Sequence, residues 1–162
     1  MSTSALFLDR DGVINRQIVD GYVTKTDEFE FLPGVLSALA KLGELFDRIF
    51  IITNQQGIGK GIFSEQDLID IHQYMSKTIC QNGGRIDKIY HCSALANDNS
   101  PFRKPNIGMG KQAMEEFPDI DIKLSVMVGD TLSDMKFGKN IGVKDNISYQ
   151  WKVYGRINKN LC

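Results

Sequence analysis

The chain has 162 residues, of which 42% are hydrophobic and 24% are charged, and its formal net charge is −1. This composition is ordinary for a soluble globular protein, and we expect a single domain over residues 1–162. The nearly neutral charge gives no electrostatic reason to expect a nucleic acid or an anionic membrane as a partner.

The chain shows no sign of export or membrane insertion. No signal peptide opens it, and no apolar run approaches the length of a membrane span. The three cysteines, Cys80, Cys92 and Cys162, have unrelated spacings that give neither a disulfide framework nor a CxxC pair. We therefore expect a cytoplasmic protein without membrane contact, and we expect a monomer.

In chain order, the first predicted element is a buried strand over residues 5–8, a short and wholly apolar run. A polar loop over residues 16–30 follows it. Pro33 then opens a predicted helix whose apolar residues recur on one face. Residues 49–53 predict a second buried strand.

A glycine-rich segment over residues 57–61 comes next, and we predict that it is a mobile loop beside a site. It lacks the spacing of a P-loop and the third glycine of a dinucleotide fingerprint. Ser64, with Asp67 three residues on, is a good N-cap for a helix that Gly83 and Gly84 end.

The remaining elements continue the alternation of strands and helices. They are a strand over residues 86–92, a long polar loop over 93–106, a helix from Gly108 to before Pro118, a strand over 125–128 and a short helix over 133–139. The end of the chain, with Trp151, is ambiguous. Strands alternating with helices predict an α/β protein with a mostly parallel sheet and helices on both faces, a three-layer, Rossmann-like fold.

The first strand ends in two carboxylates, Asp9 and Asp11, followed by Gly12. Ligands of open α/β sheets bind beyond the carboxyl ends of the strands, and the glycine allows a sharp turn there. One acid can serve as nucleophile and metal ligand and the other as general acid and base. A D-x-D pair alone is weak evidence, because Asp119 and Asp121 form another pair that reads as a solvated turn.

Two other strands end in polar residues that suit the same site. Thr53 can donate its hydroxyl to a phosphate oxygen, although a lone threonine is also common in strands. Asp130 can complete a site for Mg²⁺ with Asp9. Asp134 is either a supporting acid or an early-helix residue favoured by the helix dipole.

Clustered carboxylates require a compensating cation. Besides a divalent metal ion, the candidate is Lys104 in the segment Arg103-Lys104-Pro105, where the proline restrains the backbone. By itself, such a segment is more often solvated surface.

Taken in order, Asp9 with Asp11, Thr53, Lys104, and Asp130 with Asp134 resemble the four motifs of haloacid dehalogenase (HAD) superfamily phosphatases. The similarity extends from about Leu6 to Val143. It is greatest to the branch that contains the D-glycero-D-manno-heptose-1,7-bisphosphate 7-phosphatases and the histidinol phosphatases, through these segments: 6–15, 20–22, 29–31, 53–58 and 103–105.

The resemblance implies a Mg²⁺-dependent phosphomonoesterase. Asp9 would form an aspartyl-phosphate and Asp11 would transfer the protons, while Thr53 and Lys104 would stabilise the phosphoryl group. Asp9, the backbone carbonyl of Asp11, and Asp130 would hold Mg²⁺. The residues matched to substrate contacts in the family are Val19, Asp20, Gly21, Tyr22, Thr53, Asn54, Gln55, Gln56 and Arg103.

The chain departs from this branch at the zinc loop that many of its members carry. Cys92 is present, but Ala94, Ser100 and Phe102 replace the other three ligands. A structural zinc site needs about four ligands, so we expect no zinc. Loop order must then come from Pro101 and from packing, with Phe102 as the expected anchor. No insertion is long enough for a cap domain, so we expect a capless enzyme.

The resemblance implies that the substrate is the 7-phosphate of a heptose bisphosphate. Histidinol phosphate, or another small sugar phosphate, is the alternative within enzymes. A phospho-accepting receiver domain is a non-enzyme alternative, but a receiver carries its Lys-Pro after the last strand. Here Lys104 precedes Asp130, and Asp11 supplies an acid and base that a receiver does not need.

Overall fold

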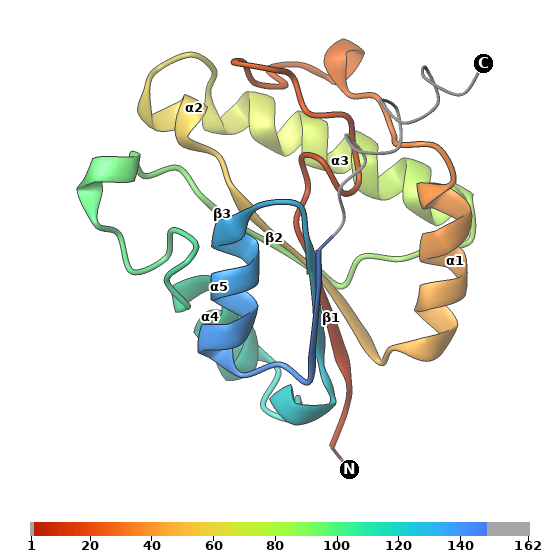
Figure 1. The fold of residues 1–162 in the computed structure, drawn as a ribbon. Coiled ribbons are helices and arrows are strands. Elements are labelled where there is room, and N and C mark those ends of the chain that lie inside the picture. Colours follow the sequence, from red (N-terminus) through yellow and green to blue (C-terminus); the bar gives the residue numbers. More distant parts are fainter. Residues whose placement is uncertain (1, 149–162) are drawn as a thin grey trace, which may run out of the picture.

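Strand β1 (Ala5–Leu8) lies at the centre of a five-stranded sheet in the computed structural model, which describes residues 2–148 (Figure 1). The strand order is β3-β2-β1-β4-β5 and every neighbouring pair is parallel. The other strands are β2 (Arg48–Asn54), β3 (Lys88–Cys92), β4 (Val126–Gly129) and β5 (Asp145–Ser148). The carboxyl ends of all five strands therefore lie at the same edge of the sheet.

The central strand is apolar throughout because both of its faces are covered. Leu6 and Leu8 belong to one core cluster and Phe7 to the other, as the two-residue period of a strand requires. Phe7 lies beside Phe50 of β2 and Met127 of β4, which fixes the register of the three inner strands.

Two pairs of helices cover the two faces (Figure 1). On one face lie α1 (Val35–Leu45) and α3 (Glu65–Gln81), which pack Leu39 and Met75 into the core with Leu6. On the other face lie α4 (Gly108–Glu116) and α5 (Leu132–Ile141), which pack Met109 and Phe137 against Phe7. The three-layer α/β fold is confirmed.

Local signals set the helix ends. Ser64 and Asp67 form a capping box at the start of α3, and Thr131 and Asp134 form another at the start of α5. After α3 the chain turns at Gly83, whose φ of 81° lies in the left-handed region that favours glycine.

One prediction about local structure is wrong. The glycine-rich segment predicted as a loop contains a one-turn helix, α2 (Gln56–Gly59), in which Gly57 is buried. It is glycine-rich because a Cβ at Gly57 would collide with Phe63 and Tyr22. The sequence also did not reveal β5, an exposed edge strand in which Ile147 is the one apolar residue, and Trp151 lies outside the described residues.

From Asp11 to Lys104, the described chain forms only the loops, strands and helices of this one layered fold, with no room for an inserted cap. Within residues 2–148, no helix combines the length and the apolar character that crossing a membrane demands.

Candidate active site

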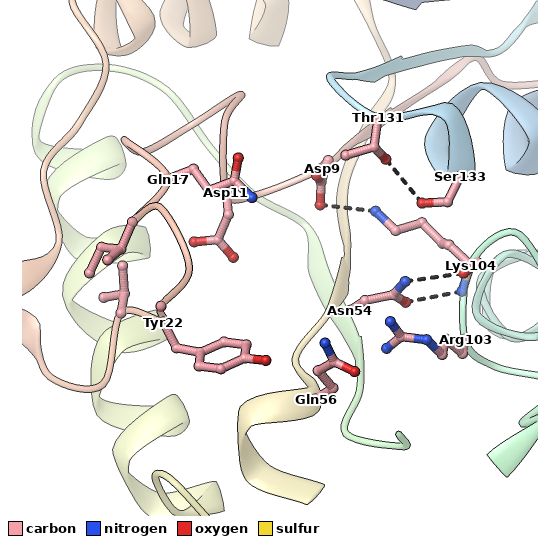
Figure 2. A pocket seen from close by; sticks show the side chains of 13 residues that line it. Asp9, Asp11, Gln17, Tyr22, Asn54, Gln56, Arg103, Lys104, Thr131 and Ser133 are labelled. Carbon is pink, nitrogen blue, oxygen red and sulfur yellow. Dashed lines mark hydrogen bonds and ion pairs between the residues drawn. The ribbon is translucent and has the colours of Figure 1, made fainter. Parts of the chain in front are cut away.

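A cleft of about 230 Å³ opens at the carboxyl ends of β1 and β2. Figure 2 shows its side chains converging from the loop after β1, the end of β2, the segment before α4 and the start of α5. Residues far apart in sequence meet here because parallel strands share this edge. The lining residues are Asp9, Asp11, Gln17, Ile18, Gly21, Tyr22, Val23, Asn54, Gln56, Arg103, Lys104, Thr131 and Ser133.

Lys104 is buried and is fully engaged at the base of the cleft. Its Nζ donates to Asp9 Oδ1 at 2.9 Å, to the carbonyl of Ile52 at 2.7 Å and to Asp134 Oδ1 at 2.6 Å. Three donors and three acceptors match, so the ammonium is held in one place despite its burial. It thereby brings a positive charge against Asp9, as predicted.

Asp134 supports this arrangement. Its Oδ1 accepts from Lys104, and its Oδ2 accepts from the backbone and hydroxyl of Thr131 and from the backbone N–H of Asp130. Since both oxygens are occupied, Asp134 anchors Lys104 and the start of α5. Of the two readings offered by the sequence, the supporting acid is the one that these contacts favour.

Asp9 and Asp130 fit a hard divalent cation. Single ligand atoms of Asp9, Asp130 and Asp134 lie within 4.8 Å of one another, and Oδ1 of Asp130 is buried without a hydrogen-bond partner. A Cβ on Gly12 would collide with the Asp130 carboxylate, so the glycine admits that carboxylate beside the loop after β1. An unpaired buried carboxylate oxygen is costly, and a bound cation would satisfy it.

The electrostatics support the same conclusion. Burial raises the pKa of Asp9, and the Asp134 carboxylate adds to this rise, while Lys104 opposes it. Burial also raises the pKa of Asp130, again with a contribution from Asp134. The described residues therefore hold more negative charge here than Lys104 alone offsets, which is the condition that a divalent metal ion relieves.

Asp11 lies in a different environment, in which four donated hydrogen bonds hold its carboxylate. Arg10 Nη2 donates to both oxygens at 2.9 and 3.0 Å, Asn15 Nδ2 to Oδ1 at 2.9 Å, and Gln55 Nε2 to Oδ2 at 2.8 Å. Burial by itself would raise the pKa of Asp11, but the charge of Arg10 and these hydrogen bonds outweigh it and lower the pKa.

The end of β2 supplies two further groups. Thr53 is buried, and its Oγ1 accepts a hydrogen bond from Gln55, which leaves the hydroxyl proton of Thr53 for donation. The amide of Asn54 pairs with the backbone N–H and carbonyl of Lys104, at 3.0 and 3.1 Å (Figure 2). This pairing ties the segment before α4 to the sheet.

The outer part of the cleft is formed by Tyr22, Gln56 and Arg103 (Figure 2). The ring of Tyr22 packs 6.1 Å from that of Phe63, and the ammonium of Lys60 lies 5.5 Å from the Tyr22 ring centroid. Arg103 Nη1 donates to the carbonyl of Ala94 at 3.2 Å, so the guanidinium is oriented by the loop before it.

Not every residue predicted to contact substrate lines the cleft. Val19 and Asp20 lie on the outer turn of their loop, where Val19 is 76% exposed. Gln55 is buried and donates to Asp11 and Thr53 instead, because the residues after a strand alternate in direction. Thr53 is also buried and is not among the lining residues. Five lining residues were not predicted from the sequence: Gln17, Ile18, Val23, Thr131 and Ser133. Among them only Thr131 gave a signal, through its position as a helix cap.

The loop over residues 93–103 is ordered by its own hydrogen bonds. Ser100 Oγ lies 3.7 Å from Cys92 Sγ and accepts from the backbone of Phe102, and the carbonyl of Ser100 accepts from Asn106. The prediction that Phe102 anchors this loop by packing is wrong, since this side chain is 46% exposed. Ser100 is the residue that links the two sides of the loop.

Comparison with known proteins adds independent findings. A family model described as polynucleotide kinase 3 phosphatase matches residues 5–149. The chain is 43% identical to a D-glycero-alpha-D-manno-heptose-1,7-bisphosphate 7-phosphatase of Campylobacter jejuni, over 88% of this chain and 80% of the relative. It is 37% identical to a D-glycero-beta-D-manno-heptose-1,7-bisphosphate 7-phosphatase of Haemophilus influenzae, over 88% and 79%.

A solved structure shows the same similarity in three dimensions. The D,D-heptose 1,7-bisphosphate phosphatase of B. bronchiseptica, crystallised with magnesium and phosphate, superposes with a TM-score of 0.82 at 34% identity. The superposition covers 91% of this chain and 80% of that one.

Proposed function

The chain belongs to the phosphatases of the HAD superfamily, and on this premise we propose that it removes the 7-phosphate of D-glycero-D-manno-heptose 1,7-bisphosphate. One observation carries the assignment of the reaction: Asp9 lies at the base of the cleft, bonded to the buried Lys104, while Asp11 lines the same cleft. A nucleophile, an acid and base, and a fixed positive charge thus face one space.

The proposed reaction has two steps. In the first, a carboxylate oxygen of Asp9 attacks phosphorus, the bond from phosphorus to the ester oxygen breaks, and Asp11 protonates the departing alkoxide. In the second, Asp11 takes a proton from water as the water oxygen attacks phosphorus, and the bond to Asp9 breaks. The positive charge of Lys104 and the hydroxyl of Thr53 stabilise the transferring phosphoryl group throughout.

Mg²⁺ is the proposed cofactor, held by Asp9, Asp130 and the backbone carbonyl of Asp11. When bound, it neutralises phosphoryl charge and orients the phosphate for in-line attack. The buried unpaired oxygen of Asp130 and the raised pKa values of Asp9 and Asp130 support this assignment. We propose no structural zinc, because Cys92 has Ser100 as its partner where a zinc loop would supply ligands.

The names of the relatives support a sugar phosphate as substrate, and they include both anomers. Tyr22, Gln56 and Arg103 are proposed to contact the sugar, with Gly21 and Asn54 beside them. Although the matched family model carries a polynucleotide in its description, the net charge of −1 offers no field for a nucleic acid. Histidinol phosphate remains the alternative substrate. A monomeric, cytoplasmic, single-domain enzyme is the proposed setting.

The test is a phosphate-release assay with Mg²⁺ on matched substrates. Both anomers of the heptose bisphosphate, the heptose 1-phosphate, histidinol phosphate and common hexose phosphates are compared by kcat/KM. We expect the highest value for one bisphosphate anomer, with release of a single phosphate. A higher kcat/KM for histidinol phosphate would reassign the substrate, and no hydrolysis of any ester by folded, Mg²⁺-loaded protein would refute the function.

A further inference from the structure

Arg10 stands between the two active-site aspartates in sequence, yet its side chain is fully buried and does not line the cleft. Its Nη2 donates to both oxygens of Asp11, and its Nη1 lies 3.2 Å from Nε2 of His72 on α3. The guanidinium carbon also lies 5.9 Å from the ring centroid of Phe29. A buried guanidinium requires matched partners, so these three contacts set the orientation of the Arg10 side chain.

His72 supplies the contact farthest from the chemistry. It is 9% exposed, and its burial lowers the pKa of His72 to about 3. The charges of Arg10 and His91 add to this decrease, and the charge of Asp11 opposes it. At neutral pH the imidazole is therefore uncharged. With its proton on Nδ1, its Nε2 accepts a hydrogen bond from Arg10.

The contacts form a continuous path from a helix to the reacting groups. α3 fixes His72, His72 orients Arg10, and Arg10 donates to the carboxylate of Asp11. Asn15 and Gln55 donate to single oxygens of that carboxylate, whereas Arg10 donates to both. Arg10 is thus the one charged donor to this carboxylate among the described residues, and together with Asn15 and Gln55 it fixes the position and the tilt of the carboxylate plane.

We infer that His72 is a positioning residue of the phosphatase reaction, which orients Arg10 so that Arg10 holds Asp11 at the angle needed for proton transfer. This inference rests on the proposed reaction, in which Asp11 protonates the departing alkoxide and later deprotonates the attacking water. A leaving group that departs as a stable anion, such as nitrophenolate, does not need a proton. The attack of Asp9 on phosphorus then proceeds without proton transfer from Asp11. His72 should therefore affect esters of alkyl alcohols more than those of nitrophenol.

The test compares His72→Leu with His72→Gln, whose side-chain carbonyl can still accept from Arg10. In His72→Leu we expect kcat on the sugar phosphate to fall about 10- to 100-fold, a part of what general acid–base catalysis supplies, with KM within about twofold of wild type. With p-nitrophenyl phosphate, we expect a fast first release of one nitrophenolate per site, followed by slow turnover. His72→Gln should recover most of the rate.

Two further variants keep the test decisive. Met75→Ala, one turn along α3 in the same core cluster, should lower the melting temperature without changing the ratio of rates on the two esters. Should His72→Leu not fold, Arg10→Lys keeps the charge but loses the second nitrogen, which joins Asp11 to His72, and we expect the same dependence on leaving group.

Equal losses in the rate of the first release from both esters, measured in a single turnover of folded His72→Leu, or full activity on the sugar phosphate, would overturn the inference. The wild-type rate on each ester is measured first. Failure of the wild type on the heptose bisphosphate would refute the proposed substrate, and the variants would then be compared on whichever alkyl phosphate it hydrolyses best.

Discussion

The base and the rim of the cleft are built in different ways. The base consists of Asp9, Asp11, Lys104 and Asp134. Hydrogen bonds tie these side chains to Ile52 of β2, to Thr131 at the start of α5 and, through Arg10, to His72 of α3. The rim consists of Tyr22, Gln56 and Arg103 and the loops that carry them. Lys104 is 3% exposed, whereas Val19 and Phe102, on two of those loops, are 76% and 46% exposed.

This difference separates the reaction from recognition of the substrate. Groups at the base cannot move without breaking several buried hydrogen bonds, so their geometry is set before the substrate arrives. Rim residues have fewer buried partners, and their loops can change without disturbing the core. We expect substitutions at the base to act on kcat and substitutions at the rim to act on KM and substrate choice.

The largest effect should come from Asp9→Asn, which removes the nucleophile at the base. We expect turnover to fall by at least about 10⁴-fold, since an amide is a far poorer nucleophile than a carboxylate. The melting temperature without metal should not fall, because burial already opposes the charge of Asp9. Phosphate release and thermal denaturation measure both, and a folded variant with turnover near wild type would show that Asp9 is not the nucleophile.

Metal binding offers a second way to separate base from rim. Mg²⁺ at a hundred times its dissociation constant should raise the free energy of unfolding by about 2.7 kcal/mol. Asp130→Asn should abolish most of this increase, because it removes a charged ligand. Asp119→Asn is the matched control, since Asp119 belongs to the other D-x-D pair, on the exposed turn. A melting curve that Mg²⁺ leaves unmoved in the wild type would contradict the metal site.

At the rim, Arg103→Ala should raise KM on the sugar phosphate about tenfold, the loss expected for a charge-assisted hydrogen bond, while kcat changes less. Arg16→Ala is the control, since Arg16 pairs with Glu30 on the exposed surface outside the cleft lining. Steady-state kinetics distinguish the two constants. A drop in kcat with KM unchanged would place Arg103 with the base instead.

The pH dependence of the free energy of unfolding tests whether His72 is buried and uncharged behind the base of the cleft. The pKa of His72 is about 3 in the folded state, below that of an ordinary histidine, so below about pH 6.5 the unfolded chain binds a proton that the folded chain does not. Its contribution to stability is thus complete above pH 6.5 and falls by up to about 1.4 kcal/mol per pH unit as the pH drops toward 3. Urea titrations should show a weaker pH dependence in His72→Gln. An identical dependence in both proteins would mean that His72 titrates normally when folded.

The smallest effect should come from Cys92→Ser. Cys92 is buried in the core, and among the described residues its Sγ has one hydrogen-bond partner, Ser100 Oγ, with which a serine hydroxyl can also pair. We expect activity within about twofold of wild type and stability within about 1 kcal/mol. Purified protein should contain no stoichiometric zinc by elemental analysis. One zinc per chain, lost together with activity in the variant, would overturn the zinc-free assignment.

The site residues at the strand ends were predictable because they end or follow strands whose apolar runs are plain in the sequence. Asp9, Thr53 and Asp130 each end or follow such a run, and a parallel sheet brings these ends together. Lys104 lies in a loop with no such signal. The clustered carboxylates and the following proline made it a candidate, and the resemblance to a known family supported that choice.

The groups behind the base were not predictable in the same way. Two of them, Arg10 and Asn15, donate to Asp11 directly, and His72 acts through Arg10. Their roles depend on the orientation of each side chain, which the sequence pattern does not give. The period of α3 predicts that position 72 faces the core, without saying what it meets there. Strand β5 was not predicted because its residues are exposed and, apart from Ile147, polar. Its pairing with β4 decides its structure.

The central position of β1 also has a consequence for how the protein is made. β1 emerges from the ribosome before the other four strands, yet its residue Leu6 pairs with Ile49 on one side and with Val126 on the other. The second edge of β1 therefore stays open until residues 126–129 are available, and an open apolar edge invites pairing with other chains. The backbone N–H of Asp9 donates to the carbonyl of Val128 at 3.0 Å, so the nucleophile reaches its final place only with β4. Such distant pairings slow folding, and a nascent chain can become active only after β4 has been synthesised.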